Sequence, residues 1–139
     1  MKRKTLRLFA FIFVLLALSV STYAATESSL YLSYYNAFIS KSGNTIQINF
    51  DVQGTRKMDT IGATEIYLYE RADSSSSWTL VQTFLSTDPA YTSSMLSNNT
   101  AFKYDYVSYT GNASYQYKAY VTVYAEKDGG SDSRGIIAY

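Results

Sequence analysis

Residues 113–125 of this chain alternate strictly between two kinds of side chain. One parity is apolar or aromatic and consists of Ala113, Tyr115, Tyr117, Ala119, Val121, Val123 and Ala125. The other parity is mostly polar and consists of Ser114, Gln116, Lys118, Tyr120, Thr122 and Tyr124. A period of two places one set on each face of a β-strand, whereas a helix would spread both sets around its circumference. The pattern therefore predicts a long central strand with the first set buried and the second facing water.

The first 24 residues have the pattern of a targeting signal. Four basic residues lie within positions 2–7, an apolar run covers residues 8–18, and small residues follow as far as Ala24 and Ala25. These are the three parts of a secretory signal peptide. The apolar run is also shorter than the ~20 residues that a membrane-spanning helix needs. We therefore expect cleavage after Ala24 or Ala25, which leaves residues 25–139 as a secreted domain without a membrane attachment.

Removal of the signal changes the charge of the chain. The whole sequence has 12 basic and 11 acidic residues, and without the four basic residues of the signal 8 and 11 remain, a net charge of −3. Such a surface, with scattered basic residues, has no electrostatic footprint for nucleic acid or anionic lipid. The chain contains no cysteine, so packing alone must hold the exported domain. Its length favours a single domain with an adequate core.

Turn signals divide the remaining sequence into segments of strand composition. We predict seven strands, at residues 29–40, 45–53, 64–70, 78–85, 101–109, 113–125 and 134–139. Residues 54–63 are predicted to be a loop, residues 91–100 an irregular connection between sheets, and residues 126–133 a hairpin loop with positive-φ positions at 128–130. No helix is predicted after the signal peptide. Strand number and spacing predict an all-β antiparallel sandwich, with Ile46, Ile48, Phe50 and Val52 in its core.

Several of these segments resemble strands of fibronectin type III domains. The pattern Tyr115-x-Tyr117-x-Ala119-x-Val121-x-Val123-x-Ala125 with the following Gly-Gly-Ser is similar to their sixth strand and loop. Residues 66–70, a polar turn and residues 78–81 are similar to their third and fourth strands. The resemblance covers about residues 64–139 and implies a seven-stranded immunoglobulin-like sandwich, although the usual early prolines and a second-strand tryptophan are missing. The whole chain also resembles a family of short, exported bacterial proteins, which implies no activity.

Composition excludes most enzyme chemistry. Histidine and cysteine are absent, which removes Ser-His-Asp and Cys-His catalysis and ordinary zinc sites. No two acidic residues have a spacing that places them around one bond; the candidates are Asp51, Asp59, Glu65, Glu70, Asp105 and Glu126. A calcium loop at residues 128–132 lacks EF-hand spacing, and a hairpin tip is the better interpretation. We therefore expect a protein that is not an enzyme and has neither cofactor nor metal.

The outward parity of residues 113–125 suggests a binding surface. Tyr120 and Tyr124 share that parity, and in the predicted sandwich the strand of Tyr67 and Tyr69 lies beside them. Four tyrosines facing the same way would form a flat aromatic surface that can stack on sugar rings or anchor a protein. The alternative is that they are cross-strand pairs that stabilise the sheet, each contributing about 0.2–1 kcal/mol.

These patterns predict a secreted, non-catalytic module that binds an extracellular glycan or protein through the four tyrosines. The alternative is a structural subunit of an extracellular assembly. In that case the strand edge at residues 29–40 or 134–139 would pair with another copy of the chain.

Overall fold

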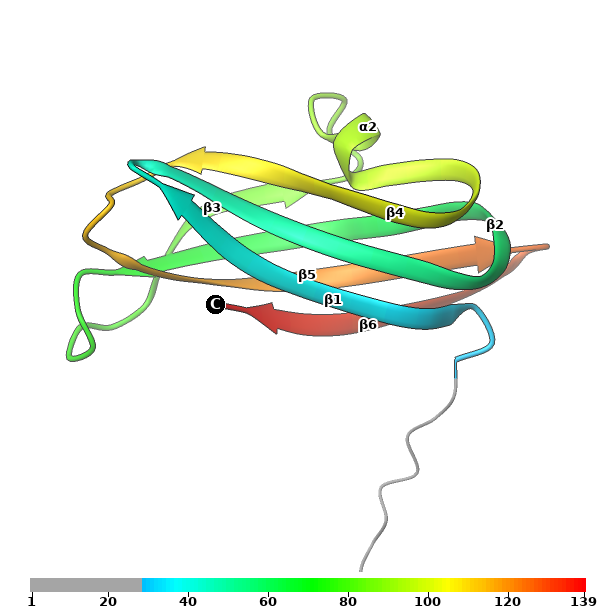
Figure 1. The fold of residues 1–139 in the computed structure, drawn as a ribbon, viewed down its shortest axis with the longest axis horizontal. Helices are drawn as coiled ribbons and strands as arrows, with labels where there is room; N and C mark the ends of the chain where they lie inside the picture. The colour runs from blue at the N-terminus through cyan, green and yellow to red at the C-terminus, as the bar shows by residue number, and fades with distance from the viewer. Residues whose placement is uncertain (1–28) are drawn as a thin grey trace, which may run out of the picture.

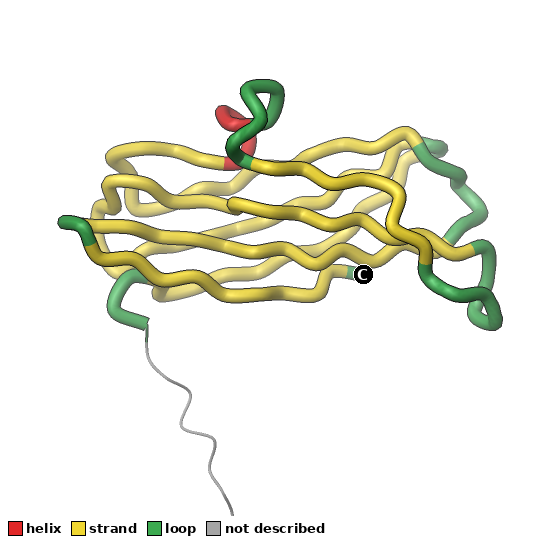
Figure 2. Tube along the Cα trace, turned by 180° about the vertical axis from the view of Figure 1, so that it is seen from behind, coloured by secondary structure: helices red, strands yellow, loops and turns green. Residues whose placement is uncertain are grey.

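The computed structural model describes residues 29–139, so the predicted signal peptide lies outside the described residues. The described chain is one antiparallel sheet of six strands that curls on itself, with a single short helix beside it (Figures 1 and 2). In chain order the elements are β1 Leu32–Ser42, β2 Thr45–Arg71, β3 Thr79–Leu85, α2 Thr92–Met95, β4 Leu96–Thr110, β5 Gln116–Lys127 and β6 Gly130–Ala138. The prediction of an all-β antiparallel fold is confirmed.

The organising element is β2, a strand of 27 residues. Residues 45–53 pair with β1 on one side and with the C-terminal half of β4 on the other. Residues 58–71 pair with β5 on one side, and with β3 and the start of β4 on the other. Figure 1 shows β2 and β4 turning back on themselves at the same end of the molecule, which folds the sheet over its own core.

The predicted loop at residues 54–63 is wrong, because these residues belong to β2. The bend lies where the β2–β4 register shifts between Gln53 and Met58, and a second shift against β5 follows Ala63. Each irregularity disturbs the parity, so that the buried residues Met58, Ile61 and Ile66 do not keep a common period of two. The merger of two predicted strands into β2 also corrects the strand number from seven to six.

Two other segments differ from the prediction. Residues 91–100 are not an irregular connection, because they contain α2 and the first residues of β4; four helical residues are too few to produce a recognisable period. The 126–133 loop is much shorter than predicted, since β5 extends to Lys127 and β6 begins at Gly130. Asp128 and Gly129 make a two-residue turn with φ angles of 54° and 80°, as tight hairpins require.

The core contains the side chains that the alternation assigned to it. Ile46, Ile48, Phe50 and Val52 are fully buried, and so is the set from Ala119 to Ala125 on β5. The assignment fails at the start of the 113–125 segment, where Ala113 is exposed and precedes the strand. All buried apolar side chains of the described chain belong to one cluster, so both halves of β2 share a single interior.

Gly62 allows β2 to approach the backbone of Met95. Its φ angle is +147°, and a Cβ atom there would overlap the Met95 carbonyl oxygen. We predict that Gly62→Ala lowers the free energy of unfolding by more than about 2 kcal/mol, because backbone strain and steric overlap both act. Gly135→Ala is the matched control, since a Cβ atom there has no neighbour within 4 Å. Urea denaturation of both variants checks this, and equal losses would contradict it.

Candidate functional site

The four predicted tyrosines lie on two neighbouring strands. Tyr67 and Tyr69 come from β2, Tyr120 and Tyr124 from β5, and the antiparallel register places Tyr67 directly opposite Tyr120. The residues that alternate with them on both strands are fully buried, among them Leu68 on β2. Because successive side chains of a strand point to opposite faces, all four tyrosines lie on the outer face of the sheet.

Three of the four tyrosines belong to one group around Lys118. Tyr67 pairs with Tyr120, and the rings of Tyr69 and Tyr120 meet edge to face with centroids 5.6 Å apart. The Lys118 Nζ lies 5.6 Å from the Tyr69 ring centroid, 5.4 Å from that of Tyr120 and 4.8 Å from that of Trp78. An ammonium group at such distances is attracted to the negative faces of the rings.

Trp78 and Arg71 complete this group, and the sequence did not identify either of them as part of it. The Arg71 Cζ lies 4.4 Å from the Trp78 ring centroid, and its Nε donates a hydrogen bond to Gln116 Oε1 at 2.7 Å. We call the surface formed by Tyr67, Tyr69, Trp78, Tyr120, Lys118 and Arg71 the tyrosine face. One feature of the sequence could have assigned them to it: Arg71 and Trp78 flank a polar turn, and such a turn returns the chain to the same sheet.

Tyr124 lies apart from this group. It pairs with Gly62, four residues and therefore about 13 Å along β5 from Tyr120. Its hydroxyl donates to Glu126 Oε2 at 2.8 Å, and it is half-buried. Burial raises the pKa of the Tyr124 phenol, and the neighbouring Glu126 carboxylate raises it further. Tyr124 therefore has a local partner on its own strand and does not extend the tyrosine face.

The tyrosine face carries two positive charges with no acidic partner in the described chain. The ion pairs within residues 29–139 involve other basic residues, and neither Lys118 nor Arg71 has a carboxylate oxygen within 4.0 Å. Both cations instead lie against aromatic rings. The arrangement can therefore receive a ligand that has an apolar face and an acidic group.

The acidic residues near the β5–β6 turn are engaged in the fold. Lys127 Nζ lies 2.7 Å from Asp59 Oδ1, and the Asp128 N–H donates to Asp59 Oδ2 at 2.9 Å. The hydrogen bond from Lys127, followed by that from Asp128, lowers the pKa of the Asp59 carboxyl. Within residues 29–139 no three His, Cys, Asp or Glu side chains gather in an arrangement that would hold a metal ion.

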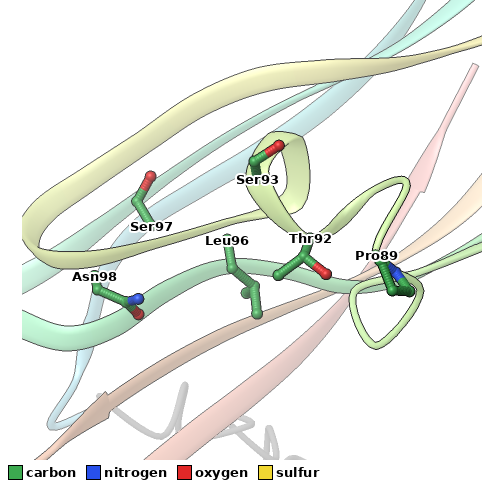
Figure 3. Close-up of a pocket in the computed structure, with 6 residues that line it drawn as sticks. All are labelled: Pro89, Thr92, Ser93, Leu96, Ser97 and Asn98. Carbon is green, nitrogen blue, oxygen red and sulfur yellow. The ribbon is translucent and has the colours of Figure 1, made fainter.

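A pocket lies beside α2. Figure 3 shows its lining, which consists of Pro89, Thr92, Ser93, Leu96, Ser97 and Asn98. None of these side chains is charged, so the pocket has no acid, base or activated nucleophile among its lining residues.

Comparison of the chain with protein-family models, with curated proteins and with solved structures finds no match. In the described residues, the structure has no helix of the length and apolar character needed to cross a bilayer. Function must therefore be inferred from the chemistry of the surface.

We predict that Lys118→Gln lowers the free energy of unfolding by about 0.5–1 kcal/mol, because the side chain loses its attraction to three rings. The same substitution should shift the emission of Trp78, the one tryptophan of the chain. Lys57→Gln, at an exposed position on the bend of β2, is the control and should change neither quantity. Urea titration followed by tryptophan fluorescence measures both, and identical curves for Lys118→Gln and the wild type would contradict the prediction.

Proposed function

We propose that this protein is a secreted, non-catalytic module that binds an extracellular glycan or protein through the tyrosine face. The observation that supports the proposal is the convergence of Tyr69, Trp78 and Tyr120 on Lys118 at the outer surface of the sheet. None of these side chains is needed to fill the core, which lies on the opposite side of the same strands.

The composition of this surface suits recognition. Tyrosine, tryptophan and arginine dominate the energetics of protein interfaces, because they combine rigid contact area with polar tips. Exposed apolar side chains extend the surface on both flanks: Leu80 of β3 pairs with Tyr69, and Ile137 of β6 pairs with Tyr120. Leu80 is 48% exposed and Ile137 47%. The two cations favour a ligand with an acidic group, such as an acidic sugar or an acidic protein segment.

We further propose that the curled sheet is an immunoglobulin-like sandwich in which the second and third strands are continuous. If β2 counts as two strands, the first, second and fifth strands form one layer. The third, sixth and seventh then belong to the other layer, together with the fourth (β3), which pairs with the third. Apart from the position of the fourth strand, this grouping is that of immunoglobulin-like domains.

Tyr117 gives independent support for this architecture. It lies at the start of β5, is 6% exposed, and its hydroxyl accepts from the Asn112 N–H at 2.6 Å and donates to the Asn112 carbonyl at 3.1 Å. Immunoglobulin-like domains have a tyrosine at the corresponding corner, whose hydroxyl bonds to the backbone a few residues upstream. Burial is the main cause of the raised pKa of Tyr117.

Removal of the Tyr117 hydroxyl should destabilise the corner before β5. We predict that Tyr117→Phe lowers the free energy of unfolding by about 1–3 kcal/mol, because the Asn112 amide loses its partner in a half-buried position. Tyr115→Phe is the matched control, since that hydroxyl has no hydrogen bond within the described chain; it should change stability by less than about 0.5 kcal/mol. Chemical denaturation compares the two, and equal stabilities would count against the tyrosine corner.

The binding function is tested with Tyr67→Ala combined with Tyr120→Ala. Both side chains are outside the core, so we expect the variant to keep its far-ultraviolet spectrum while binding to acidic glycans on arrays and to acidic proteins in pull-downs falls at least tenfold. A ligand on this face should also change Trp78 fluorescence, because Trp78 is part of the surface. Leu30→Ala, at an exposed apolar residue that precedes β1 and belongs to neither strand of this surface, is the control. Undiminished binding by the double variant would refute the assignment.

The alternative function, assembly through strand edges, depends on which edges of the sheet are open. In the structure β1 and β6 lie side by side, and the Ile39 N–H donates to the Tyr139 carbonyl at 3.1 Å, so the two edges named for assembly partly engage each other (Figure 1). Within the described chain β3 pairs only with β2 and leaves one edge open. Elution of the wild type as a large assembly, together with no detectable ligand, would favour this alternative.

A further inference from the structure

Aromatic and polar side chains form parallel columns on the outer face of the other half of the sheet. β1 carries Tyr34 and Phe38, and β4 carries Phe102, Tyr104 and Tyr106. The strand between them, residues 45–53 of β2, presents a column of polar side chains: Gln47, Asn49, Asp51 and Gln53. The register aligns them in rows, Phe38–Asn49–Tyr106, Asn36–Asp51–Tyr104 and Tyr34–Gln53–Phe102. We call this surface the β1–β2–β4 face.

The five rings of this face are exposed and serve no visible structural purpose. Phe102 is 63% exposed, Tyr104 60%, Tyr106 and Tyr34 46%, and Phe38 41%. None of them belongs to the core cluster. Each ring has a polar side chain as its cross-strand neighbour, and the rings of β1 and β4 are separated by β2, a distance of about 10 Å. Aromatic cross-strand pairing therefore does not explain them.

The inward-facing side chains of β4 show that the exposure of these rings is unusual. Lys103 alternates with Phe102 and Tyr104 and faces inward, only 8% exposed. Its Nζ is held by Asp105 Oδ2 at 2.8 Å and by the Ser93 carbonyl of α2 at 2.9 Å. A strand that buries a lysine and exposes three rings contradicts the usual pattern of burial, and such contradictions concentrate at functional sites.

Asn49 provides a polar group at the centre of the face. It is 6% exposed and lies between Phe38 and Tyr106 in its row. Its Nδ2 donates to Ser40 Oγ at 3.0 Å, whereas no described residue donates to its Oδ1. The described chain contains no enclosed side-chain nitrogen or oxygen without a partner, so this Oδ1 must reach the surface. It is an acceptor held in place between two rings.

We propose that the β1–β2–β4 face is a second binding site, for an uncharged glycan chain. Sugar rings have apolar C–H faces that stack on aromatic side chains, and hydroxyls that both donate and accept hydrogen bonds. The amides of the central column match such hydroxyls in both directions. Phe102, Tyr104 and Tyr106 recur about every 7 Å along β4, which suits an extended chain rather than a single sugar.

Charge and desolvation select this ligand over the other candidates. Asp51 is the one charged side chain in the three rows, and no basic residue lies among them, so an acidic glycan would be repelled. A protein partner would have to bury the polar column and pair each of its groups, or incur the cost of unsatisfied polar atoms. A neutral polyhydroxylated chain brings a hydroxyl to each.

Affinity electrophoresis tests the proposal. The purified protein is run in native gels that contain hydroxyethylcellulose, arabinoxylan, galactomannan or β-1,3-glucan. We expect retardation by at least one polysaccharide that added salt does not weaken, because the ligand is uncharged. Tyr104→Ala combined with Tyr106→Ala should lower the association constant about tenfold or more, since two stacking rings are lost. Phe102→Ala, at the most exposed ring, is a second variant in case the double variant does not fold.

The matched control is Tyr67→Ala combined with Tyr120→Ala, which should bind these polysaccharides like the wild type. Trp78 lies on the tyrosine face, so its fluorescence should stay constant when a neutral polysaccharide binds to the opposite half of the sheet. A change in Trp78 fluorescence therefore indicates a ligand on the tyrosine face, whereas retardation without such a change indicates a ligand on the β1–β2–β4 face. Three results would each overturn the proposal: no retardation of the wild type by any polysaccharide, equal retardation of wild type and the Tyr104/Tyr106 variant, or loss of retardation on addition of salt.

Discussion

Contact between the two halves of β2 holds this domain together. Ile48 and Phe50 from the first half and Ile66 and Leu68 from the second are fully buried in one cluster. Each such side chain contributes on the order of 1.5–3 kcal/mol as an upper estimate, and no disulfide assists them. Because one strand supplies both sides of the interior, the bend at residues 54–58 determines whether the two sets of side chains meet. Gly62, in the second half of β2, is required for a separate reason, because a Cβ atom there would overlap the Met95 carbonyl oxygen.

A sheet folded over its own core leaves two outer faces, and here they differ in charge. The tyrosine face combines rings with Lys118 and Arg71, whereas the β1–β2–β4 face combines rings with amides and Asp51. Both surfaces use the parity of strands whose other parity fills the interior, so neither interferes with packing. Under the two proposals above, one small domain would therefore present two surfaces for ligands of different charge.

The sequence predicted those parts of the fold where the two-residue period is uninterrupted. Residues 116–125 and 45–52 have the expected strands and buried sets. Prediction failed at residues 54–63, because a bend and a bulge change the parity and a strand then resembles a loop. The same limit applies to the site. Parity was enough to place Tyr120 on the outer face, but it left the face of Tyr67 and Tyr69 open, because Ile66 and Leu68 on the other parity are apolar as well. Trp78 and Arg71 flank a turn without any period, and their contact depends on the path of that turn.

The β1–β2–β4 face was beyond prediction for a different reason. Its rows exist only when the register between β1, β2 and β4 is known, and β4 lies some fifty residues from its partner in the sequence. The alternation of Phe102, Tyr104 and Tyr106 by itself is typical of a buried face, and the structure reverses it through the enclosed Lys103. An enclosed ammonium group is costly unless it is paired, and Asp105 with the Ser93 carbonyl provides that pairing. Stability alone would favour the opposite orientation, with rings inside and the lysine in water. Folding stability therefore does not account for the outward display of the rings, whereas the glycan binding proposed above would account for it.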